Sequence, residues 1–200
     1  MNKAVLKDSF LLCCAFVCAL LYLPHFVFYF FCDNKRLIDE DILANNGFCR
    51  IKKLPRFFVF LFLLHSSPYF RTLFYYRIGP VRSIFLCWYR PGAKYFHIPY
   101  STIIGGGLCC VHPWCTTLNA EKIGRNFNVK QNTTIGISHF QGRSPRIGDD
   151  VDVGCNAVII GDIVIGNNVT IGAGSVVVKS VPDNAVAVGN PAKVIKYKNM

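Results

Sequence analysis

The sequence predicts a mainly β fold, a parallel β-helix preceded by an apolar α-helical region, and two patterns carry this prediction. In the second half of the chain, aliphatic residues recur at every sixth position, at Ile147, Val153, Ile159, Ile165, Ile171 and Val177. In the first half, the run from Phe10 to Cys32 contains no charged residue. We therefore expect two domains, a hydrophobic helical region over residues 1–100 and a β-helix over residues 101–200.

The six-residue period excludes the two common alternatives for the second half. A helix has a period of about 3.6 residues and a strand a period of two, so neither explains a repeat unit of six residues. One short strand and one turn per hexad do, and three hexads, about 18 residues, close one triangular coil. The aliphatic residue then fills the interior, and a following glycine, as at Gly148 and Gly154, sits at a tight turn. An earlier block with Ile123, Val129 and Ile135 lies in the same phase.

The segment between Ile135 and Ile147 equals two hexads, but its sequence does not fit two regular strands. Gln141 would occupy the interior position, where a polar side chain without a partner is costly. We therefore expect this segment to leave the coil as an extruded loop.

The apolar run from Phe10 to Cys32 is long enough to cross about 30 Å of hydrocarbon as a helix. A buried or interfacial helical hairpin, broken at Pro24, is an alternative. A cleaved secretory signal is a third, although the run is too long and no small-residue cleavage site follows it.

The rest of the first half is apolar and aromatic but contains no second run of that length. Phe57–Leu64 is too short to cross a membrane, so it should lie at the membrane interface or pack on the second half. Residues 66–96 mix aromatic residues with arginines at loosely helical spacing, and Pro80 and Pro91 mark breaks. We expect a short helical region there.

The composition favours a membrane over a nucleic acid as partner. Hydrophobic residues make up 52% of the chain, and the formal charge is +11. The basic residues of the first half closely follow the apolar run, as at Lys35, Arg36 and Lys52, which suits the anionic cytoplasmic leaflet. The ten cysteines lie mostly in apolar runs without metal-ligand spacing, so we expect a reduced chain and no metal.

The second half also carries motifs of a known family. From Val111 to Lys196, with VHPW, GRNFNVKQNTTIG and IGAGSVVVKSVPDNAVAVGNPAKVI, the chain resembles serine acetyltransferases and their relatives that acetylate exopolysaccharides. Upstream, YLPHFVFYFF and FRTLFYYRIG are similar to the polysaccharide-linked members. The resemblance implies a left-handed β-helix, acetyl-CoA as co-substrate, and a homotrimer with active sites between neighbouring subunits.

Acetyl transfer from a thioester to a hydroxyl needs a base for the hydroxyl proton, a stabiliser for the oxyanion and a proton for the leaving thiolate. His112, in CCVHPWCTT at the entrance to the repeat, matches the family's catalytic histidine. The other candidates, His25, His65 and His97, lie in or beside apolar segments, and we expect structural roles for them.

The resemblance also implies substrate-binding residues, with two departures from the family pattern. The family places an aspartate before the catalytic histidine and a second histidine before the next repeat block, where this chain has Val111 and Ser144. His139 could reach the same pocket as that second histidine, and Arg143 matches a substrate-binding arginine. Since the missing residues contact the amino-acid substrate in the family, a sugar hydroxyl becomes a better acceptor than free L-serine.

For acetyl-CoA, the sequence suggests a column along the coils. Ile137, Cys155 and Ala173 are spaced by one coil each, so they should stack where the family carries its acetyl-CoA contacts. Lys179 and Lys193 follow the last full coil, where resembling enzymes bind the nucleotide end of the molecule, and ammonium groups there would pair with its phosphates.

These inferences lead to one main hypothesis and two alternatives. The first is an acetyl-CoA-dependent O-acetyltransferase that modifies a hydroxyl of a polysaccharide or lipid-linked sugar precursor at the cytoplasmic face of a bacterial cell membrane. The second is a serine O-acetyltransferase of cysteine biosynthesis. The third is a non-catalytic β-helix scaffold, in which His112 would be dispensable.

Overall fold

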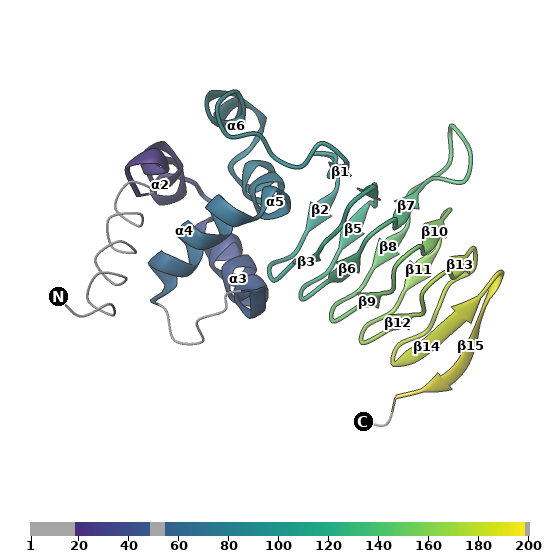
Figure 1. Ribbon diagram of the computed structural model, residues 1–200. Helices are drawn as coiled ribbons and strands as arrows, with labels where there is room; N and C mark the ends of the chain where they lie inside the picture. The colour runs from purple at the N-terminus through teal and green to yellow at the C-terminus, as the bar shows by residue number, and fades with distance from the viewer. Residues whose placement is uncertain (1–18, 49–54, 199–200) are drawn as a thin grey trace.

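The computed structural model describes residues 19–48 and 55–198, and it has two parts. A group of short helices lies at one end, and a three-sided parallel β-helix extends from it to the C-terminus (Figure 1). The predicted fold class is therefore confirmed. The boundary that the sequence suggested near residue 100 falls between the first two strands, β1 and β2.

The helical part consists of short segments with local reasons to begin and end. They are α2 (Leu23–Phe30), α3 (Lys35–Asn45), the 3₁₀ turn η1 (Asn46–Phe48), α4 (Arg56–Ser66), α5 (Pro68–Ile78) and α6 (Pro80–Cys87). Ser67 caps α5, because its hydroxyl accepts from the backbone N–H of Phe70, and Pro68 occupies the first turn. Gly79 ends α5 with φ +89° and Pro80 starts α6 directly after it. The predicted helical region over 66–96 is thus present.

The apolar run from Phe10 to Cys32 lies partly outside the described residues, and its described part is not one continuous helix. The chain leaves the helical conformation at Tyr22, directly before α2 begins with Pro24 in its first turn, and His25 and Phe26 are buried in the helical region. Within residues 19–48 and 55–198, no single helix has the length and apolar character of a membrane span. By those two criteria α4 and α5 would qualify only as a pair, and they are bent by 110°.

The β-helix has three sheets, one on each side of the triangular coil. One contains β1 (Phe96–His97), β4 (Thr116–Leu118), β7 (Thr134–Gly136), β10 (Val158–Ile160) and β13 (Val176–Val177). The second contains β2 (Ile103–Ile104), β5 (Lys122–Ile123), β8 (Arg146–Ile147) and β11 (Val164–Ile165). The third contains β3 (Cys109–Val111), β6 (Asn128–Lys130), β9 (Asp152–Val153), β12 (Thr170–Ile171), β14 (Ala185–Gly189) and β15 (Ala192–Tyr197). All described pairs are parallel except β14 with β15.

The aliphatic residues of the hexad fill the interior, as predicted. All six residues from Ile147 to Val177 at this spacing are buried in one continuous core. The glycines that follow them have a different role from the predicted one, because a Cβ at Gly154 would lie 2.5 Å from the backbone nitrogen of Ala173 in the next coil. Close approach of neighbouring coils therefore explains the glycine, while the left-handed conformation falls two positions later, at Asn156 and Asn168.

The predicted loop is also present. Ile135 pairs with Ile159 across it, whereas Ile159 pairs with Val177 in the next coil, so the coil that contains the loop is longer by one hexad. Gln141 is exposed rather than interior, and Phe140 is 95% exposed. The expectation that this segment leaves the coil, based on Gln141 at an interior position of the repeat, is thus confirmed.

The helical part closes the first coil with buried polar side chains. Arg77 of α5 forms an ion pair of 2.8 Å with Asp41 of α3 and donates to the carbonyls of Ile104 and Gly105, at 2.6 Å each. Asp41 in turn accepts from the backbone N–H groups of Gly107 and Leu108. The first coil has no preceding coil to satisfy these backbone groups, so side chains from two helices take that place.

Candidate active site

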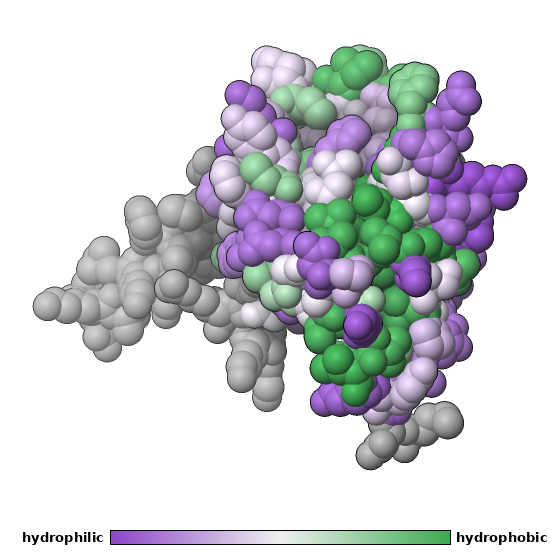
Figure 2. Space-filling view, turned by 90° about the vertical axis from the view of Figure 1, so that its right-hand side faces the viewer, coloured by the Kyte–Doolittle hydropathy of each residue, from purple (hydrophilic) through white to green (hydrophobic). Residues whose placement is uncertain are grey.

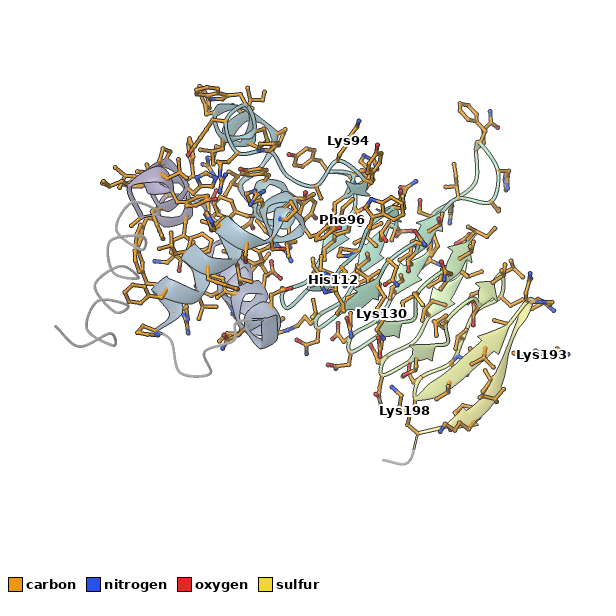
Figure 3. All side chains as sticks on the ribbon, in the orientation of Figure 1. Lys94, Phe96, His112, Lys130, Lys193 and Lys198 are labelled. Atoms are coloured by element: carbon orange, nitrogen blue, oxygen red, sulfur yellow. The ribbon has the colours of Figure 1, made fainter. Side chains whose placement is uncertain are left out.

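His112 lies in the turn from β3 to β4, at the corner between two sheets of the first coil (Figure 3). Its backbone has φ +48°, and its carbonyl accepts from the N–H of Trp114 at 2.7 Å. A left-handed conformation is uncommon for a residue other than glycine and tends to occur where a side chain is held for a function. The turn leaves the His112 side chain exposed.

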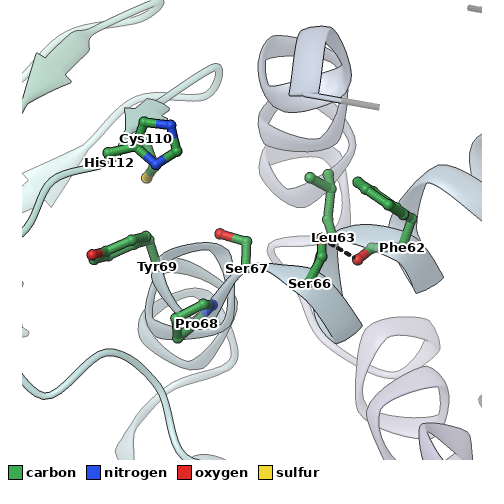
Figure 4. A pocket seen from close by; sticks show the side chains of 8 residues that line it. All are labelled: Phe62, Leu63, Ser66, Ser67, Pro68, Tyr69, Cys110 and His112. Atoms are coloured by element: carbon green, nitrogen blue, oxygen red, sulfur yellow. Dashed lines mark hydrogen bonds between the residues drawn. The ribbon is translucent and has the colours of Figure 1, made fainter. Parts of the chain in front are cut away.

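A cavity of about 370 Å³ lies between this corner and the helical region (Figure 4). Its walls come from α4, the start of α5 and β3, and are formed by Phe62, Leu63, Ser66, Ser67, Pro68, Tyr69, Cys110 and His112. In Figure 4 the His112 ring lies on the β-helix side, opposite the residues from α4 and α5. The volume is within the range of small-molecule sites. Phe57–Leu64, for which two locations were expected, lies in α4, which packs against α3 and α5 and faces the second half across this cavity.

The chemical character of the cavity is neutral. Aromatic and aliphatic surfaces alternate with the hydroxyls of serine and tyrosine, and among the described residues none that lines the cavity is a carboxylate or an arginine. Burial raises the pKa of the Cys110 thiol well above its usual range, so this thiol remains protonated beside His112. Among the described residues that line this cavity, His112 thus carries the side chain suited to act as a general base.

The predicted substrate residues lie at a different corner. His139 and Arg143 belong to the extruded loop between β7 and β8, where His139 contacts the Ser138 hydroxyl at 3.0 Å and Arg143 pairs with Asp162 at 4.0 Å. His112 lies instead at the corner between β3 and β4. Within one chain, His112 thus lies at one end of the strands of the sheet that contains β4 and β7. His139 and Arg143 lie at the other end of these strands, so the three residues do not share a pocket.

The predicted column is correct for two of its three residues. The N–H of Gly174 donates to the carbonyl of Cys155, so Cys155 and Ala173 lie at the same corner of successive coils. This corner joins the same two sheets as the turn that contains His112. Ile137 lies elsewhere, because the N–H of Gly161 donates to the carbonyl of Gly136 next to it. The extra hexad of the loop shifts Ile137 by one corner, which makes the predicted stacking of Ile137 wrong.

The two predicted phosphate-binding lysines are exposed and lie apart in the fold. Lys179 follows β13, at the corner type that carries the loop, and Lys193 lies on β15, opposite Val188 of β14. Both ammonium groups are accessible to a ligand. Neither lies in the cavity that contains His112.

The residues of the cavity wall opposite His112 were not predicted from the sequence. Phe62, Ser66 and Tyr69 were assigned only to apolar or helical segments. The Ser67–Pro68 pair could have indicated that α4 ends and α5 begins there, since it combines a cap with a first-turn proline. No pattern in the sequence states that this junction meets the turn that contains His112.

Comparison with known proteins identifies the repeat. Residues 144–179 match the family model described as bacterial transferase hexapeptide (six repeats). The chain is 37% identical over 114 residues to the mitochondrial serine acetyltransferase 3 of Arabidopsis thaliana, which covers 56% of this chain and 27% of that protein. It is 41% identical over 101 residues to WcaB of Escherichia coli K12, named for an acetyltransferase role in colanic acid biosynthesis, covering 50% of this chain and 62% of that one.

The structural comparison extends over more of the chain. The crystal structure of serine acetyltransferase from Neisseria gonorrhoeae matches with a TM-score of 0.66 and 28% identity, over 83% of this chain and 66% of that one. The matches to these three proteins thus span between 27% and 66% of their lengths. The chain carries the hexapeptide repeat of bacterial transferases and is homologous to the serine acetyltransferases and to WcaB.

Proposed function

We propose that this chain is an acetyl-CoA-dependent O-acetyltransferase that acts on a hydroxyl of a polysaccharide or a lipid-linked sugar precursor. The observation that carries the proposal is the position of His112, held in a left-handed turn at the edge of a neutral cavity of about 370 Å³. The similarity to named acetyltransferases supports it.

In this mechanism His112 removes the proton from the acceptor hydroxyl while its oxygen attacks the thioester carbonyl. The tetrahedral intermediate then collapses with cleavage of the C–S bond, and His112 returns the proton to the leaving thiolate. The ester and the free thiol are the products, so atoms and charge balance without a metal. The exposed imidazole of His112 can serve in both roles, because the nitrogen that accepts the proton can return it.

The composition of the cavity favours a sugar over L-serine. A free amino acid carries a carboxylate and an ammonium group, which a binding site normally pairs with opposite charges. The cavity offers hydroxyls and apolar surfaces instead, and Val111 and Ser144 replace the two residues that the serine enzymes use. Neutral hydroxyl acceptors with an apolar portion suit these walls better.

Acetyl-CoA would lie along the corner that contains Cys155 and Ala173, which continues from the turn of His112 toward the C-terminus. The backbone groups of successive turns there can bind an extended pantetheine arm. Lys179 and Lys193 would meet phosphates of the nucleotide end. Because these lysines lie at different sides of the coil, a second copy of the chain would be needed to bring them to one nucleotide pocket.

A homotrimer would complete the site. Since His112 and the loop with His139 and Arg143 lie at opposite ends of the strands of one sheet, a neighbouring copy packed along that sheet could bring its loop to this chain's His112. We place the enzyme at the cytoplasmic face of the cell membrane, where acetyl-CoA and lipid-linked sugars are both accessible.

The first experiment measures thiol release from acetyl-CoA by the full chain, with L-serine and a panel of sugars and sugar nucleotides offered separately. We expect release with a sugar and a loss of about 10²–10⁴-fold in the His112→Ala variant, with acetyl-CoA binding retained. Serine-dependent release would favour the serine acetyltransferase alternative. Undiminished turnover by His112→Ala would exclude the proposed base.

A mixing experiment tests the shared site. The variants His112→Ala and Arg143→Ala are unfolded and refolded together, so that mixed trimers contain some interfaces with both native residues. Partial recovery of activity is expected if the two residues act across an interface. Recovery no greater than that of the separately refolded variants would place both residues in the same chain's site or exclude Arg143 from it.

A further inference from the structure

The outward face of α6 is apolar. Val81, Ile84, Phe85 and Trp88 follow the i, i+3, i+4, i+7 spacing of one helical face, and Val81 is 70% and Trp88 81% exposed. The opposite face is buried and includes Ser83, whose hydroxyl is 3.2 Å from that of Tyr100. A helix on the surface of a water-soluble domain normally shows the reverse arrangement, so this face is adapted to something other than water.

The exposed apolar surface continues onto the helix beside it. The Phe28 and Phe85 rings stack at 6.4 Å, and the Tyr89 hydroxyl donates to the carbonyl of Leu21, which fixes α2 against α6. On the α2 side, a second set of exposed apolar residues follows helical spacing: Leu20, Leu23, Val27, Phe30 and Phe31. We call these nine residues together the apolar shelf.

Basic side chains border the apolar shelf. Lys35 holds its ammonium group 4.8 Å from the centroid of the Phe30 ring, and the adjacent Arg36 side chain is 82% exposed. Arg82 lies on α6 itself, Arg36 is paired with Glu40 at 3.2 Å, and Asp33 lies between Phe31 and Lys35 in the chain. A surface with apolar residues in the middle, Trp and Tyr at its edge and cations around it matches the composition of a lipid headgroup interface.

We propose that the apolar shelf binds the surface of an anionic lipid bilayer, with α2 and α6 lying in the plane of the headgroups. Two further observations favour a bilayer over a second copy of the chain. The cations at the border would repel one another in a symmetric pair of shelves. The uncharged sequence from Phe10 onward leads directly into the shelf at Leu20, so the chain that precedes it is itself suited to lipid.

Trp88 provides a direct probe, since the chain has two tryptophans and the variant Trp114→Phe leaves Trp88 alone. Full-length protein with this substitution is mixed with vesicles of phosphatidylcholine containing phosphatidylglycerol. We expect a blue shift of the Trp88 emission and quenching by lipids brominated along the acyl chain. An unchanged spectrum in the presence of bound vesicles would overturn the proposal, because the shelf would then face away from the lipid.

Sedimentation with the same vesicles compares two sets of substitutions. The triple variant Val81→Ser, Ile84→Gln and Trp88→Gln is expected to reduce partitioning by about tenfold or more, as lost apolar insertion requires. Apolar residues also gather on the opposite end of the molecule, over the last coils (Figure 2). Val178→Ser, Ile195→Gln and Tyr197→Gln, at exposed positions of that end, form the matched control and should leave partitioning unchanged.

The outcomes separate this proposal from the catalytic one. The shelf variant should retain thiol release with a soluble acceptor, and His112→Ala should retain vesicle binding. Equal partitioning of the shelf variant and the unsubstituted protein, or loss of vesicle binding only in the control variant, would contradict the proposal that the apolar shelf binds lipid. A change in oligomeric state without lipid, measured by sedimentation velocity, together with unchanged vesicle binding would identify the surface as an interface between copies.

Discussion

The β-helix and the helical region bury different kinds of side chain. In the coils, the interior consists mainly of aliphatic residues, with Phe96 and Phe127 among them, and the polar groups that enter it include small hydroxyls such as Thr133 and Ser175. In the helical region, His25, Asp41 and Arg77 are buried while large apolar residues of α2 and α6 face outward. The coils thus follow the usual division between inside and outside, and the helices partly reverse it.

This difference follows from how each part satisfies its backbone. Each inner coil hydrogen-bonds to the coil before and after it, so its side chains need only fill the interior. The helical region must instead close the open edge of the first coil and end several short helices. Arg71, for example, donates to the carbonyl of Leu64 near the end of α4 and to that of Pro91. Such tasks require buried polar side chains.

The strongest test of this comparison is the buried ion pair of Asp41 with Arg77, which lies within the helical region and hydrogen-bonds to the backbone of the first coil. Asp41→Ala leaves the Arg77 guanidinium buried without its carboxylate and removes the acceptor of two backbone N–H groups. We expect a loss of about 3–5 kcal/mol in the free energy of unfolding, measured by urea titration. The exposed pair of Lys130 with Asp152 is the control, since Lys130→Ala should cost about 0–1 kcal/mol. Similar losses in the two variants would show that the helices do not stabilise the first coil.

A coil residue should cost less and for a different reason. Ile159→Ala removes a fully buried side chain from the continuous core, and we expect a loss of about 3 kcal/mol from lost burial and the cavity left behind. The adjacent Ile160 is half-buried on the outer side of the same strand, so Ile160→Ala provides the matched control and should cost much less. Equal losses of stability would contradict the assignment of Ile159 to the interior and Ile160 to the outer side of β10.

The dependence of stability on pH should come from the helical region. Burial lowers the pKa of His25 to about 4, with the positive charges of Arg71 and Arg90 acting in the same direction. Its ring lies between the hydroxyls of Tyr75 and Tyr89, at 3.0 and 3.2 Å. Because the unfolded value is about 6.5, the unfolded chain binds more protons between these two values. Stability should therefore fall as the pH falls from about 6.5 to about 4 and then level off with respect to this residue.

Urea titrations at pH 7.5 and pH 5 measure this contribution. The linkage relation gives a loss of about 2 kcal/mol over that interval for the unsubstituted protein. His25→Gln removes the titrating group, so the difference between its stabilities at the two pH values should be smaller by that amount. An unaltered pH dependence in the variant would assign the effect to other groups.

The same comparison explains what could be predicted from the sequence. The hexad reports the interior of every coil because each coil repeats one geometry, and Gln141 marked the loop by breaking the pattern. The role of Asp41 could not be predicted, since its partners Arg77 and Gly107 are distant in sequence and no repeat relates them. His112 was identified by its motif, but the cavity beside it depends on how the α4–α5 junction packs. The shifted position of Ile137 shows the limit of counting residues where the coil length changes.

The smallest expected effect on stability is in the extruded loop, which lies outside both the coil interior and the helical region. Phe140 is 95% exposed, so Phe140→Ser should change the free energy of unfolding by less than about 0.5 kcal/mol. A large exposed aromatic side chain has little stabilising role within one chain, and in the proposed trimer this loop would meet a neighbouring copy. If the loop completes a neighbour's site, the same substitution should raise the KM for the acceptor with little change in stability. An unaltered KM would restrict the site to the corner of His112 and leave the loop without a part in catalysis.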